Sequence, residues 1–155
     1  MPHSTARSHP PHAGDPIRSS VDAIAIVSLA IHRPLEPETI AFLLDDHRCS
    51  NTITVVSGTK DPDSVLTVVE CMAMAASRVP GLSAVVLATV RPRCAQFPAG
   101  DVATNTTATV PGDLDRWMEA NEIADAHGIE LIEWFIVGPS GVNCPRELFG
   151  EPERW

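Results

Sequence analysis

Short apolar runs, interspersed with segments of helical periodicity, constrain the fold of this chain more than any other feature. β-Branched residues dominate the runs, and such residues pack well on a pleated, buried surface. We therefore predict a strand from each run, at 23–31, 39–44, 52–56, 84–88 and 129–137. The first run also permits a helix, because alanine alternates through it. The polar turn at 45–48 predicts that the second and third strands form an antiparallel hairpin.

Two segments carry the periodicity of amphipathic helices. Asp61 can cap the first of them, with Pro62 in the first helical position. Its apolar residues recur at helical spacing and predict one buried stripe: Val65, Val68, Val69, Met72 and Ala76. The second helix is predicted over 113–127 and stops at Gly128. This order of elements predicts an α/β (α+β) fold with helices on the faces of a mixed central sheet.

The chain length of 155 residues fits one domain, which we place at 21–155. Residues 1–20 are rich in Pro, His and Ser, and we predict a disordered tail because they offer little apolar surface to bury. The histidines of this tail are either a metal-chelating tract or incidental: His3, His9 and His12. The segment 93–110 has no periodicity and predicts a long loop.

Composition narrows the classes of partner. The formal net charge is −9, and the 11 basic residues form no run, which opposes binding to a phosphate backbone. The longest apolar run, 23–31, is too short to cross a bilayer, and the first residues show no basic segment followed by an apolar one, so we expect no signal peptide. We therefore expect no nucleic-acid or membrane partner. The cysteines form no CxxC pair and predict reduced thiols in a cytoplasmic protein: Cys49, Cys71, Cys94 and Cys144.

The sequence contains no P-loop, no GxGxxG fingerprint, no GxSxG elbow and no HExxH motif. Three other stretches stand in a fixed order. Phe-Leu-Leu-Asp at 42–45 precedes Val-Val-Ser-Gly-Thr at 55–59; Val-Leu-Ala-Thr-Val-Arg-Pro follows at 86–92, and Gly-Ile-Glu-Leu-Ile-Glu-Trp-Phe-Ile-Val-Gly at 128–138. In this order they resemble the RadC-like branch of the JAB/MPN (JAMM) domain family.

The resemblance implies a cytidine-deaminase-like sheet and the site of a zinc metallopeptidase. In that family, two histidines of an HxH motif and an aspartate at the start of the following helix hold the metal, and a glutamate activates water. Here Thr89-Val90-Arg91 stands in place of HxH, so Thr89 and Arg91 occupy the histidine positions. The remaining two positions each have two candidates: Asp113 or Asp115 for the aspartate, and Glu38 or Glu36 for the glutamate.

These replacements imply a degenerate metal site. Arginine stays protonated and does not bind zinc, and threonine is a weak ligand. Arg91 can instead form a bidentate ion pair with Asp113, and we predict that this pair replaces the metal. The alternative is that both residues are solvated loop charges. With the ion pair in place, no metal and no other cofactor is expected.

The resemblance implies a pseudoenzyme, a catalytically inactive JAB domain that binds or scaffolds a protein or peptide partner. Its degenerate site comprises Glu38, Thr89, Arg91 and Asp113. One alternative is an active zinc-dependent hydrolase with rearranged ligands, drawn from Asp113, Asp115, Glu38 and either His47 or His127. Another is an acidic structural domain with no active site. The sequence leaves the partner and the oligomeric state open.

Overall fold

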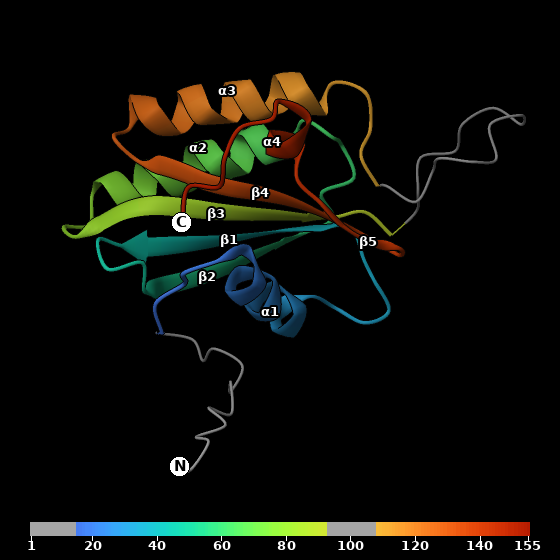
Figure 1. The fold of residues 1–155 in the computed structure, drawn as a ribbon, viewed down its shortest axis with the longest axis horizontal. Coiled ribbons are helices and arrows are strands. Elements are labelled where there is room, and N and C mark those ends of the chain that lie inside the picture. Colours follow the sequence, from blue (N-terminus) through green and yellow to red (C-terminus); the bar gives the residue numbers. More distant parts are fainter. Residues whose placement is uncertain (1–14, 93–107) are drawn as a thin grey trace, which may run out of the picture.

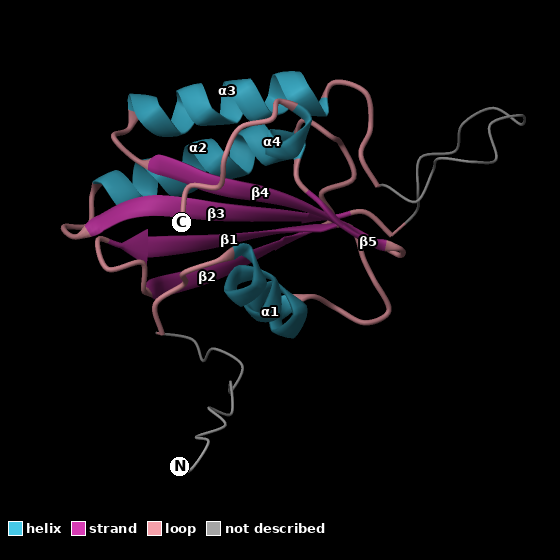
Figure 2. Ribbon diagram, in the orientation of Figure 1, coloured by secondary structure: helices cyan, strands magenta, loops and turns pink. Residues whose placement is uncertain are grey.

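The computed structural model of the chain describes residues 15–92 and 108–155. Helices and strands are mixed along this part of the chain, so the predicted α/β class is confirmed (Figure 2). The elements are α1 (Ser20–Ala30), β1 (Glu38–Asp45), β2 (Ser50–Ser57), α2 (Ser64–Ser77), β3 (Leu82–Val90), α3 (Asp113–Ala126), β4 (Glu130–Gly138), β5 (Gly141–Asn143) and α4 (Pro145–Leu148).

The strands form a five-stranded sheet in the order β2-β1-β3-β4-β5. β1 is antiparallel to both of its neighbours, β2 and β3, which confirms the predicted hairpin. β3 and β4 are parallel, and α3 makes the crossover between them. The register places Thr39 opposite Thr89, so the start of β1 lies beside the end of β3. This end of the sheet carries the residues predicted for the site.

Helices cover both faces of the sheet (Figure 1). α2 and α3 pack on one face, where Leu87 and Trp134 belong to the same buried cluster as Trp117 of α3. α1 packs on the other face, where Ile40 and Phe42 lie in a second buried cluster. Strand side chains alternate between faces, so β1 and β3 contribute to both clusters and are buried along most of their length.

The first apolar run forms a helix, α1, so the strand predicted at 23–31 is wrong. The Ser19 hydroxyl accepts a hydrogen bond from the backbone N–H of Asp22 at 3.3 Å and caps the helix. Ala23, Ile26 and Val27 then share one buried face at helical spacing. The helix prevails because the sheet offers that face a partner, and such packing outweighs the weak helix propensity of β-branched residues.

The predicted disordered tail also extends too far. Residues 15–20 are folded onto the domain: Pro16 pairs with Cys49, and Ile17 is fully buried and donates its backbone N–H to the Arg48 carbonyl at 2.9 Å. Ile17 supplied the missed signal, because one large apolar side chain is enough to anchor a short segment. The tail histidines and most of the predicted loop, 93–107, lie outside the described residues.

Smaller differences concern element ends. α2 begins at Ser64, and the Asp61 carboxylate accepts a hydrogen bond from the N–H of Asp63 rather than from the helix. The sequence did not predict β5 or α4, which are short. Among the described residues no helix has the length and apolarity to cross a membrane. Three cysteines in the described part carry free thiols, Cys49, Cys71 and Cys144, whereas Cys94 lies outside it.

Candidate functional site

The C-terminal end of β3 and the first residue of α3 meet at one end of the sheet. Arg91 directly follows β3 and donates its backbone N–H to the carbonyl of Val137 in β4 at 2.8 Å. Alternation along β3 places Thr89 and Arg91 on the face covered by α3, the helix that begins at Asp113. The β3–α3–β4 crossover therefore brings together two residues that are 22 positions apart in sequence.

Arg91 and Asp113 form a bidentate ion pair, as predicted. The two bonds join Nη1 to Oδ2 at 2.7 Å and Nη2 to Oδ1 at 3.0 Å. Nη1 also donates to the Ala108 carbonyl at 3.0 Å, and the guanidinium carbon lies 6.0 Å from the centre of the Trp134 ring. The fork of the guanidinium matches the carboxylate in geometry and charge, which makes this type of pair strong. The alternative of two solvated charges is therefore wrong.

Asp113 is buried and receives two further hydrogen bonds. The backbone N–H of Val110 donates to Oδ2 at 2.7 Å, and Nη1 of Arg116 donates to Oδ1 at 3.0 Å. Arg116 also binds Asp63 at 2.8 Å. Burial lowers the pKa of Arg116, but its hydrogen bonds to Asp63 and Asp113 raise it more, so the net pKa is raised. Four donors therefore occupy the oxygens of Asp113, and two of the groups are cations.

Thr89 serves the packing of the core. Its hydroxyl accepts a hydrogen bond from Nε1 of Trp134 at 2.9 Å, and both residues are buried. A buried tryptophan N–H needs such a partner, because an unsatisfied donor in the interior costs about 1–3 kcal/mol. Both residues at the predicted histidine positions thus make specific structural contacts, Thr89 with Trp134 and Arg91 with Asp113.

Glycine at the end of β4 allows the chain to close over this pair. A Cβ atom on Gly138 would lie 2.6 Å from the Cβ of Ala108, closer than carbon atoms approach. Only glycine therefore lets residue 108 come near enough for its carbonyl to accept from Arg91. The chain turns at 139–140 after β4, and Gly138 has a packing role that the sequence did not reveal.

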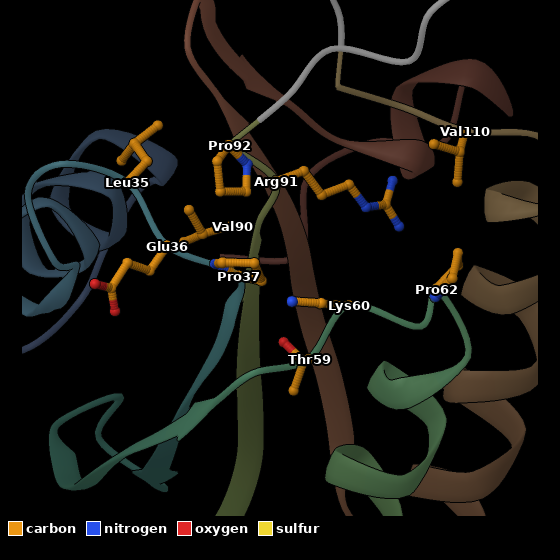
Figure 3. Close-up of a pocket in the computed structure, with 10 residues that line it drawn as sticks. All are labelled: Leu35, Glu36, Pro37, Thr59, Lys60, Pro62, Val90, Arg91, Pro92 and Val110. Atoms are coloured by element: carbon orange, nitrogen blue, oxygen red, sulfur yellow. The ribbon is translucent and has the colours of Figure 1, made fainter.

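The structure does not bring Glu38 to this ion pair. Glu38 is two positions before Ile40 and four before Phe42 on β1, so all three side chains lie on the same face of the sheet, the one that α1 covers. There its carboxylate accepts from the backbone N–H of His32 at 2.9 Å and contacts Nδ1 of the same residue at 2.6 Å. This hydrogen bond raises the pKa of His32. Glu36, the other candidate, lines a cavity beside Arg91, but its carboxylate points away from Arg91 (Figure 3).

The other residues named for a rearranged metal site are dispersed. Asp115 is exposed on the first turn of α3, and His47 is exposed in the β1–β2 turn. His127 caps the opposite end of α3, about 20 Å from Asp113 for a helix of this length. Within residues 15–92 and 108–155, no three His, Cys, Asp or Glu side chains are grouped so that they could hold a metal ion.

A cavity of about 550 Å³ opens beside Arg91 at this end of the sheet (Figure 3). Lys60, the only lysine of the chain, lines it together with Thr59. Glu36 and Arg91 add two further charged side chains to the lining, and the remaining walls are apolar, formed by Leu35, Pro37, Pro62, Val90, Pro92 and Val110. An apolar cavity with a few polar groups is the usual form of a ligand site. Lys60 was not singled out from the sequence, because it directly follows the stretch at 55–59 and belongs to no motif itself.

A second buried ion pair, which the sequence analysis missed, joins β4 to α4. Nε of Arg146 binds Oε2 of Glu133 at 2.7 Å, and both side chains are almost completely buried. Burial raises the pKa of Glu133 more than Arg146 lowers it, and burial also raises the pKa of the neighbouring Cys144 thiol. A charged residue inside the apolar run 129–137 was the available signal, because a buried charge requires a partner.

Comparison with known proteins identifies no relative, so the site is described by its geometry alone. No protein-family model matches the chain, and no curated protein matches it significantly. What the residues themselves define is a bidentate ion pair with a buried aspartate, at the rim of a cavity that has both apolar and polar walls, in a mixed α/β fold.

Proposed function

We propose that the chain is a catalytically inactive RadC-like JAB/MPN domain that binds a peptide segment of a protein partner. The observation that carries this proposal is the bidentate pair between Arg91 and Asp113, which stand at two of the positions where the resemblance places metal ligands. The order of hairpin, helix, strand, helix and strand supports the same family. The family assignment itself rests on the three sequence stretches and on this order.

The residues at the implied metal position do not fit zinc. A zinc ion at Asp113 would have to displace two arginine side chains and a backbone N–H from the carboxylate. Arg91 offers only donors and a permanent positive charge, which repels a divalent cation. The hydroxyl of Thr89 is already engaged by Trp134. Without zinc there is no activated water, so the site holds the chain in place and does not hydrolyse a peptide bond.

The cavity beside Arg91 supports binding of a peptide segment. Its apolar walls suit one or two apolar side chains, and Lys60 can bind a carboxylate, either from an acidic side chain or from a chain terminus. A volume of about 550 Å³ accommodates a few residues.

Zinc content tests the inactive site. We expect the full chain, with His3, His9 and His12 replaced by alanine, to bind no stoichiometric zinc by elemental analysis after dialysis against zinc. The matched control carries Thr89→His and Arg91→His in the same background, which restores the HxH spacing next to Asp113, and this variant should bind zinc. One zinc per chain in the protein with Thr89 and Arg91 intact would contradict the proposal.

Selection from a displayed peptide library tests the binding function. We expect selected peptides to combine apolar residues with a carboxylate and to lose affinity by at least about tenfold for Val110→Arg, which fills the cavity. Val79→Arg is the control, because Val79 is exposed but lies outside the cavity lining. Peptides that bind both variants equally would place the binding surface elsewhere, and cleavage of a bound peptide would contradict the inactive site.

A further inference from the structure

The outer edge of β2 is the surface that the proposed function does not use. β1 pairs with one side of this strand, and among the described residues no strand of the sheet pairs with its other side. On the face that α1 covers, Ile53 and Val55 lie opposite Phe42 and Ile40 of β1, yet they are 37% and 38% exposed. β2 therefore presents free backbone groups and apolar side chains together along one edge.

The described chain begins beside the start of this edge (Figure 1). Pro16 forms an antiparallel bridge with Cys49, the residue before β2, and the N–H of Ile17 donates to the Arg48 carbonyl at 2.9 Å. Because the two segments are antiparallel, the chain that precedes Pro16 is directed along the free edge of β2. Residues 1–14, which lie outside the described part, therefore start where pairing along this edge can continue.

The hydrogen bonds of β2 show which of its groups face the free edge. Gly58, which directly follows the strand, donates its N–H to the Pro37 carbonyl at 2.7 Å and so points towards β1. Neighbouring residues of a strand point in alternate directions, so the backbone groups of Ile53, Val55 and Ser57 point away from β1. In the regular part of β2, these three residues are the positions at which a further strand can bond.

The N-terminal segment reaches these positions in a defined register. The hydrogen bond of Ile17 sets the bonding positions of this segment, which recur at residues 15, 13 and 11. The register between β1 and β2 shifts at the start of β2, and the extra residue moves the next bonding position of β2 to Ile53. This register aligns Ala13 with Ile53, and Pro11 with Val55.

We infer that residues 12–14 add a short antiparallel strand to the edge of β2 and that this strand ends at Pro11. Ala13 donates its N–H to the Ile53 carbonyl and accepts a hydrogen bond from the Ile53 N–H. Pro11 has no N–H to donate, and its ring takes the space in which the donor to the Val55 carbonyl would lie, so the ladder stops there.

Three features favour this occupant over a strand from another molecule. The segment is already attached and aligned by the Pro16–Cys49 bridge, so it gives up little freedom of movement on pairing. Residues 1–14 contain no Asp or Glu, whereas a net charge of −9 repels a second copy. Alternation from the buried Ile17 directs the side chain of Ala13 to the α1 face, where Ile53 is exposed. No residue of β2 lines the cavity, so the inference does not depend on the proposed peptide binding.

Hydrogen exchange of the full chain, followed for each amide by NMR, tests the inference. Ile53 and Val55 are a matched pair, because they share one strand and one face and are almost equally exposed. We expect the Ile53 amide, corrected for its intrinsic rate, to exchange at least about threefold more slowly than the Val55 amide, since one added pair of hydrogen bonds gives modest protection. Equal rates for the two amides would overturn the inference.

Two proline substitutions identify the strand that protects Ile53. Ala13→Pro removes the donor of the inferred pair, and it should raise the exchange rate of Ile53 to that of Val55. His12→Pro is the matched control, because residue 12 lies between two bonding positions, and Ile53 should stay protected in this variant. The inference fails if protection of Ile53 survives Ala13→Pro, is lost equally in both variants, or rises with protein concentration as pairing between molecules requires.

Discussion

The two buried ion pairs of this domain differ in what surrounds them. Arg146 and Glu133 are enclosed, with side-chain exposures of 5% and 0%, and Arg146 also donates to the Glu151 carbonyl. Arg91 and Asp113 stand at the rim of a cavity, where the Arg91 side chain is 13% exposed. The enclosed pair ties the C-terminal segment to β4, whereas the rim pair leaves one face of an arginine available to a ligand.

The two ion pairs also differ in how many hydrogen-bond donors the carboxylate has. Glu133 has one arginine partner, and burial raises its pKa in spite of that partner. Asp113 has Arg91 and Arg116 together with a backbone N–H. A carboxylate that shares two cations tolerates the loss of one, but a carboxylate with a single cation does not. Loss of one arginine should therefore lower the stability of the fold more at the enclosed pair than at the rim pair.

The largest effect is expected from Arg146→Ala. It leaves Glu133 without a cation in the interior, and an uncompensated buried charge costs about 3–5 kcal/mol. Guanidinium unfolding at neutral pH measures this loss, with Glu147→Ala, at an exposed neighbour in α4, as the near-neutral control. The double variant Glu133→Leu with Arg146→Met should recover most of the stability, because apolar residues of similar size need no partner.

A smaller loss, about 2–3 kcal/mol, is expected from Asp113→Ala in the same unfolding measurement. The change leaves Arg91 and the Val110 N–H without their acceptor, but water from the cavity can reach Arg91. Asp115→Ala, an exposed carboxylate on the same turn, should change stability by less than about 0.5 kcal/mol. If Asp113→Ala costs as much as Arg146→Ala, the distinction between an enclosed and a rim pair fails.

Local patterns explain why much of the fold was predictable. The hairpin β1–β2, the strands β3 and β4 and the helices α2 and α3 each have a continuous apolar run or stripe, and neighbouring elements pair in space. The Arg91–Asp113 pair followed from the positions that the resemblance aligned, at the end of one strand and the start of the next helix. Such contacts at element ends are set by chain order, which the sequence contains.

The remainder depends on which face each residue occupies. Glu38 lies near Thr89 in register, but its carboxylate is on the α1 face, whereas Thr89 faces α3. Counting alternate positions from Ile40 would have shown this. The pair between Glu133 and Arg146 was less accessible, because a register shift in β4 next to Glu133 breaks the alternation. α1 was ambiguous because an uninterrupted apolar run fits either a strand or a helix.

A third carboxylate, Glu38, sharpens the comparison and gives the smallest effect, because only one member of its pair is buried. The His32 ring is mostly exposed, and its hydrogen bond to Glu38 raises the His32 pKa above 6.5. A raised pKa in the folded state means that this pair contributes its full stability below pH 6.5 and loses it as the pH rises through the raised value.

His32→Asn removes the titration but keeps the backbone N–H that binds Glu38. In urea unfolding from pH 5.5 to 9, the advantage of the unmodified chain over His32→Asn should shrink steadily toward high pH. An advantage that stays constant across this range would show that the His32 charge does not contribute, and that burial of one partner alone is not enough to make an ion pair count.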